Sequence, residues 1–151
     1  ALAPTELRRS SISHWRRCAL ALAVLTLLFA ALVLAQFLQF TRPAGSLPSF
    51  AAFQGDALPY AVLLPAQLAI VLMMAGTTIS VTEGRVAPRY ARGRRLRLFG
   101  ALYFAGSLSR VLIGLTVPDA PPWFDAWIPA VFHFVLAGFV LVLAAFHLRR
   151  F

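Results

Sequence analysis

The chain has 151 residues, of which 60% are hydrophobic and 13% charged, and its mean hydropathy is +0.79. Soluble domains are about 45–50% apolar and about 25% charged, so the composition excludes an ordinary water-soluble globule. All 14 basic residues are arginines, and with only five acidic residues the net charge is +9. In a chain this apolar, the surplus indicates cytoplasmic loops of a membrane protein, and we expect no nucleic-acid binding. The single cysteine, Cys18, excludes an intramolecular disulfide.

The first predicted span is a helix over about 18–40, because residues 18–41 carry no formal charge. About 20 apolar residues are enough to cross the hydrocarbon core. Val33 and Ala35 have the spacing of a signal-peptide cleavage site. The apolar run is nevertheless longer than the roughly 7–15 residues of a signal peptide. The sequence therefore predicts a retained transmembrane helix.

The second predicted span covers about 57–82, an uncharged run that ends at Glu83. We expect Pro59 in its first turn, where a missing N–H is tolerated, and a kink or loosening at Pro65. Glu83 is expected to form an exposed ion pair with Arg85.

The third and fourth spans are predicted over about 97–117 and 126–148. The third is interrupted only by Arg110, and the fourth has Pro129 near its start. Four spans leave only tails and short loops, so we divide the chain into an N-terminal segment 1–17, a membrane domain 18–148 and a tail 149–151.

The arginines set the orientation. All except Arg42 and Arg110 flank the expected spans on one side, so the positive-inside rule places both termini in the cytoplasm. Aromatic residues then lie at the two membrane interfaces: Trp15 at the inner one, and Trp123, Phe124 and Trp127 at the outer one. The predicted fold is an all-α integral membrane protein, an antiparallel four-helix transmembrane bundle. We expect a bacterial inner membrane, because no organellar transit extension is evident.

Small residues predict how the spans pack, since close contact in lipid depends on them. The third span carries Ala101, Ala105 and Ser109 at intervals of four, with Gly106 and Gly114 beside them. The fourth carries Ala130, Ala137 and Ala144 at intervals of seven. We therefore expect the third and fourth spans to be the tightest neighbours. The first span is rich in Leu and Phe and is expected to face lipid or another subunit over much of its surface.

Polar residues within the spans define a candidate ligand site, because such residues are expensive in hydrocarbon. We expect five of them to form a pocket in the outer half of the membrane: Arg110, His133, Gln36, Gln67 and Tyr60. Two simpler interpretations stay open. The side chain of Arg110 would reach outward to lipid phosphate, and the others would form interhelical hydrogen bonds without a ligand. Turned inward, Arg110 would pair with Asp56, Asp119, Asp125 or a bound anionic or carbonyl group.

Histidine spacing suggests an alternative. His133 and His147 are 14 residues apart, which places them on similar faces of one helix. This spacing resembles the helices of dihaem cytochromes b. The resemblance implies b-type haem, with His147 and either His14 or His133 as candidate ligands.

Known catalytic and metal-site motifs are missing from the sequence, so we expect neither catalysis nor a metal site. The sequence favours a small non-catalytic subunit or accessory protein of a larger membrane complex. Its pocket would hold a lipid, quinone or pigment. Its partners would be membrane lipids and other integral membrane subunits or further copies of itself. A haem electron-transfer subunit and an oligomeric transporter or channel are the alternatives.

Overall fold

The computed structural model describes residues 4–54, 58–121, 124 and 126–148, and these contain helices but no strands. In chain order the helices are α1 (Pro4–Thr41), α2 (Phe50–Gln54), α3 (Tyr60–Thr82), α4 (Tyr90–Thr116) and α6 (Trp127–Leu148). Four of them are long and apolar enough to cross a membrane. The prediction of an all-α protein with four candidate spans is confirmed.

The helix bounds differ from the prediction at two charged ends. α1 begins at Pro4 rather than near residue 18, and α4 begins at Tyr90 rather than near residue 97. Both extensions are rich in arginine, which is a good helix former, so the helices continue past the point where the charge marks the end of the apolar run. The short helix α2 was not predicted.

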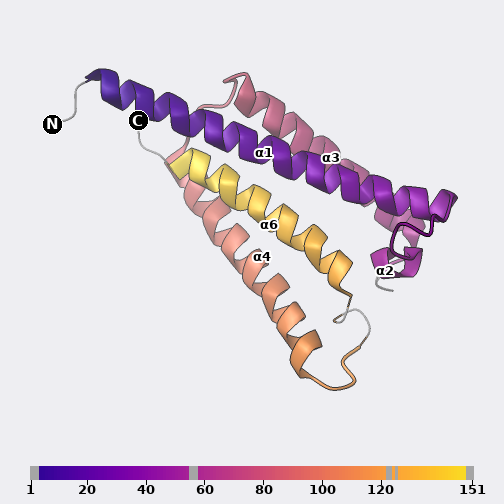
Figure 1. The fold of residues 1–151 in the computed structure, drawn as a ribbon. Helices are drawn as coiled ribbons and strands as arrows, with labels where there is room; N and C mark the ends of the chain where they lie inside the picture. Colours follow the sequence, from indigo (N-terminus) through magenta and orange to yellow (C-terminus); the bar gives the residue numbers. More distant parts are fainter. Residues whose placement is uncertain (1–3, 55–57, 122–123, 125, 149–151) are drawn as a thin grey trace.

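The four long helices lie side by side in the order α3, α1, α6, α4 (Figure 1). α6 packs against α4 and α1, and α1 packs against α3. The N-terminal end of α1 and the C-terminal end of α6 lie at the same end of the molecule, and α1 and α4 diverge towards the opposite end. α3 and α4 therefore stand at the two edges and make no extensive contact with each other.

The tight pair α4 and α6 was predicted, but with the wrong face of α4. Ala101, Ala105 and Ser109 are exposed, and Gly106 has no atom within 4 Å of the place where its Cβ would stand. The buried positions are instead Gly93, Gly100, Ser107 and Arg110. Leu96 and Tyr103 lie between them, so the buried face recurs every three and four residues, the period of left-handed helix pairs.

Two glycines on this face let the backbones approach closely. A Cβ on Gly93 would stand 2.9 Å from the backbone nitrogen of Leu148, and a Cβ on Gly100 would stand 2.9 Å from the Leu141 side chain. On α6 the predicted alanines are confirmed as buried: Ala130, Ala137 and Ala144. Small residues on both helices therefore make this contact possible.

α1 and α3 are joined by three polar contacts along their length. The indole Nε1 of Trp15 donates to the carbonyl of Val81 at 3.0 Å. The hydroxyls of Thr26 and Thr78 are 3.1 Å apart, and the Gln67 amide donates to that of Gln36 at 2.8 Å. Hydrogen bonds of this kind add to packing where lipid surrounds the helices.

The other face of α1 packs against α6, with an edge-to-face contact between Phe29 and Phe132. Leu20 and Leu27 point away from both neighbours and are exposed. The expectation that α1 faces lipid or another subunit therefore holds for one face only, because α1 is also the link between α3 and α6.

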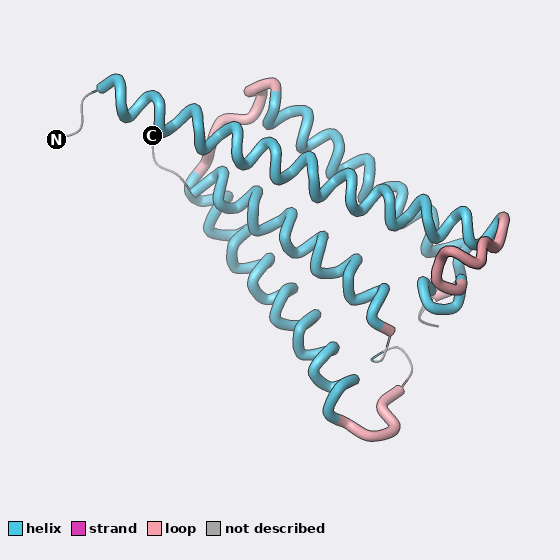
Figure 2. The backbone as a smooth tube through the Cα atoms, viewed as in Figure 1, coloured by secondary structure: helices cyan, strands magenta, loops and turns pink. Residues whose placement is uncertain are grey.

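Loops join the helices at both ends of the molecule (Figure 2). The predicted ion pair between Glu83 and Arg85 is confirmed in the loop after α3, and both side chains are largely exposed. Trp127 is exposed at the start of α6. Several residues used in the predictions lie outside the described residues: Asp56, Trp123, Asp125, Arg149 and Arg150.

Candidate ligand-binding cavity

A cavity of about 290 Å³ lies at the end of the molecule where α1 and α4 diverge. Its apolar wall combines aromatic and aliphatic side chains, namely Phe29, Phe53, Leu63, Ile70, Phe132 and Leu136. Its polar lining comes from α2, α3, α4 and α6, namely Gln54, Gln67, Tyr103, Arg110 and His133. A mostly apolar pocket with a few convergent polar groups is typical of small-molecule sites.

Arg110 turns inward. Its side chain is only 7% exposed although it lies on a helix at the edge of the molecule. It belongs to the face of α4 that packs on α6, and its guanidinium donates to the carbonyl of Ala126 at 3.4 Å. This geometry agrees with the inward interpretation rather than with a side chain that extends to the lipid headgroups. Of the acidic residues considered as its partners, Asp56 and Asp125 lie outside the described residues, and Asp119 is exposed.

His133 faces the same cavity and is held by Tyr103. The Tyr103 hydroxyl lies 2.5 Å from Nδ1 of His133, and the two rings meet edge to face. Because Nδ1 is engaged, Nε2 is the ring nitrogen left for a ligand. Tyr103 was not among the predicted site residues. Its position seven residues before Arg110, on the same helix face, was the signal that pointed to it.

Gln67 closes the cavity on the α3 side, and Gln36 lies behind it. Both are buried, and they share one hydrogen bond from Gln67 Nε2 to Gln36 Oε1. Gln67 Oε1 and Gln36 Nε2 have no hydrogen-bond partner among the residues that the structure describes. Buried polar atoms without partners are uncommon, because each loses its hydration without compensation. Gln67 also lines the cavity, so a small rotation of its amide would offer this unsatisfied carbonyl to a donor supplied by another molecule.

Tyr60 is not brought into the cavity. Its ring packs against Phe40 and Phe50, with ring centroids 4.7 Å and 5.0 Å away, and its buried hydroxyl has no partner in the described part of the chain. Of the five predicted site residues, Arg110, His133 and Gln67 line the cavity, Gln36 supports it, and Tyr60 belongs to an aromatic cluster beside it.

The three histidines have separate contacts. Nε2 of His14 contacts the thiol of Cys18 at 3.4 Å, and Nδ1 of His147 accepts a hydrogen bond from the backbone N–H of Arg89 at 3.1 Å. The cavity that His133 lines contains neither His14 nor His147. Ligation by two histidines needs one on each side of the haem, and these contacts do not offer that pair. Within the described ranges, no three His, Cys, Asp or Glu residues are grouped to hold a metal ion.

No protein-family model, curated protein or solved structure matches the chain. The geometry of the cavity is therefore the basis for a functional proposal.

Proposed function

We propose that the chain is a non-catalytic membrane subunit that binds a lipophilic molecule in the cavity between α3 and α4. The occupant carries a hydroxyl or carbonyl group at its polar end, as lipids, quinones and pigments do. The unsatisfied carbonyl of Gln67, buried in the wall of a largely apolar cavity, is the observation that supports this most strongly. A hydroxyl of the ligand would donate to it.

The remaining lining fits the same class of molecule. Phe29 and Phe132 meet edge to face in the apolar wall and offer aromatic surface to a ring or an acyl chain. Arg110 and His133 also line the cavity, and Nε2 of His133 would donate to an oxygen of the ligand. With Gln67 on α3, these groups would hold the ligand between α3 and the pair formed by α4 and α6, with which α3 makes no extensive contact.

The same proposal includes the membrane arrangement. Both termini lie in the cytoplasm, the helices form an antiparallel bundle in a bacterial inner membrane, and the cavity opens in the outer half. The excess of arginine at the ends of α1, α3 and α4 opposite to the cavity supports this orientation. The outer faces of α3 and α4, at the two edges of the row of helices, are where a larger membrane complex or a second copy would pack.

Gln67→Leu is expected to remove the bound molecule, because leucine supplies no acceptor for its hydroxyl. The measurement is extraction of the protein purified from its native membrane, followed by mass spectrometry of the extract. Binding of a short-chain quinol to the extracted protein then gives the affinity, and we expect it to fall about tenfold, as loss of one buried hydrogen bond implies.

Two further variants make this test specific. Tyr103→Phe keeps the ring but removes the hydroxyl that orients His133, so it is also expected to weaken binding. Ser109→Ala is the control, because Ser109 is exposed and bonds only to its own helix, at the carbonyl of Ala105. Equal ligand content in Gln67→Leu, Tyr103→Phe and Ser109→Ala, or none in any of them, would contradict the proposal. A Soret band in the visible spectrum would favour the haem alternative instead.

A further inference from the structure

A second cavity lies at the opposite, arginine-rich end of the molecule. Its volume is about 310 Å³, and it lies between α3 and the pair formed by α4 and α6. α3 contributes Met73, Gly76 and Thr77, α4 contributes Arg92, and α6 contributes His147. It shares no residue with the cavity that contains Arg110.

Trp15 indicates how deep this cavity lies relative to the membrane surface. Val81 lines the cavity, and its carbonyl accepts the hydrogen bond from the indole of Trp15. Tryptophan side chains prefer the boundary between hydrocarbon and headgroups, so the cavity extends across that boundary. Towards the hydrocarbon, Leu72 and Met73 form an exposed apolar wall.

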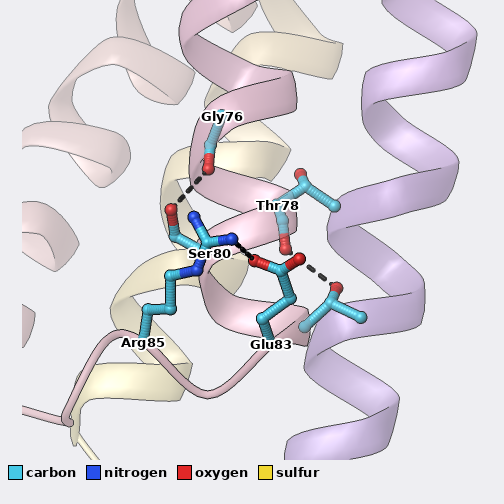
Figure 3. Close-up of polar contacts among 6 residues, drawn as sticks. Gly76, Thr78, Ser80, Glu83 and Arg85 are labelled. Carbon is cyan, nitrogen blue, oxygen red and sulfur yellow. Dashed lines mark hydrogen bonds and ion pairs between the residues drawn. The ribbon is translucent and has the colours of Figure 1, made fainter.

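The polar side of the cavity carries the positive charge of Arg92, for which the described residues supply no counter-ion. No described carboxylate lines the cavity, and Glu83, at the end of α3, is paired with Arg85 (Figure 3). The guanidinium of Arg92 makes no ion pair with any residue in the described part of the chain. The Ser80 hydroxyl is bonded to the carbonyl of Gly76, whereas Thr77 lines the cavity with its hydroxyl unbonded within the described ranges.

We propose that this cavity binds one anionic phospholipid, with its phosphate against Arg92 and Thr77 and an acyl chain along Leu72 and Met73. The occupant follows from the combination of depth, charge and shape. A phosphate at the headgroup level meets an unpaired guanidinium, and the chain continues into hydrocarbon along an apolar wall. Gly76 leaves the cavity open, because no atom lies within 4 Å of the place where its Cβ would stand.

The test is to place the protein in vesicles of phosphatidylcholine and phosphatidylglycerol, extract it gently, and count retained lipids by native mass spectrometry. The unaltered chain is expected to retain phosphatidylglycerol in preference to phosphatidylcholine. Arg92→Ala is expected to lower that retention about fivefold, the effect of one basic residue near an anionic membrane surface. Gly76→Leu places a side chain in the cavity from a position where the Cβ has open space, and it is expected to lower retention similarly.

Arg94→Ala is the matched control, since Arg94 is an exposed arginine on the same helix that does not line the cavity. It is expected to retain phosphatidylglycerol as the unaltered chain does. Equal losses in Arg94→Ala and Arg92→Ala would show diffuse attraction and overturn the site. Full retention in Arg92→Ala and Gly76→Leu would overturn it as well. Gln67→Leu, which removes a group of the other cavity, is expected to leave this lipid bound.

Discussion

Gly93→Ala is expected to lower the free energy of unfolding by about 1–3 kcal/mol, the usual effect of overpacking a close contact. The added methyl group would stand 2.9 Å from the backbone nitrogen of Leu148 and 3.0 Å from the carbonyl carbon of His147. Backbone atoms of a helix cannot turn aside as a side chain does, so α4 and α6 must separate. Unfolding in mixed micelles, with increasing sodium dodecyl sulfate, measures the change.

Gly106→Ala provides the control for this prediction. Gly106 lies on the same helix, but nothing is within 4 Å of its Cβ position. Since alanine is the better helix former, this variant is expected to unfold no more easily than the unaltered chain. If Gly93→Ala proved as stable as Gly106→Ala, the close contact between α4 and α6 at this end would be wrong.

Arg110→Met is expected to lower the free energy of unfolding by about 1.5–3 kcal/mol, as removal of a hydrogen bond from a charged group does. Methionine keeps an apolar stem but supplies no donor to the carbonyl of Ala126, which the guanidinium contacts at 3.4 Å. The first turn of α6 would lose this link to α4. The same variant is expected to weaken binding of a short-chain quinol, because Arg110 lines the cavity.

Arg97→Met is the comparison for Arg110→Met. Arg97 lies on α4 and is exposed, so its replacement is expected to change the stability by less than about 0.5 kcal/mol, as is usual for surface positions. If the Arg110 side chain extended to the lipid headgroups instead, its replacement would change the stability as little as Arg97→Met does. Equal stability of the two variants would therefore contradict the inward orientation of Arg110.

The four helices were predictable because each depends on a property that the sequence shows directly. An uncharged run of about 20 residues needs no knowledge of its neighbours to be identified as a span. The charged extensions of α1 and α4 were missed because charge marks where hydrocarbon ends, not where a helix ends. The helix α2 was missed because its five residues lie in a loop without a periodic pattern.

The packing face of α4 was predicted wrongly. That helix carries two sets of small residues, and the prediction used the set with intervals of four. The structure uses Gly93, Gly100 and Ser107, spaced by seven, because α6 presents Ala130, Ala137 and Ala144 with the same period. The matching period on the two helices was visible in the sequence, and it would have placed Tyr103 beside Arg110.

The polar residues of the candidate site could be predicted from the sequence, but which of them come together in space could not. Polar residues in apolar runs identify Arg110, His133 and Gln67 without any structure. Whether two such residues meet depends on how the helices diverge, and no local pattern encodes that. Tyr60 was therefore included, although it packs with Phe40 and Phe50 beside the cavity.

The most direct test of the four-span arrangement is whether the two ends of α3 lie in different compartments. In a Cys18→Ala background, single cysteines at Ser46 and Ala87 provide exposed positions near opposite ends of this helix. They are treated with a membrane-impermeant thiol reagent in intact cells and in inverted vesicles. We expect Ser46→Cys to react only in intact cells and Ala87→Cys only in inverted vesicles. Reaction of both cysteines from the same side would contradict a chain that crosses the membrane four times.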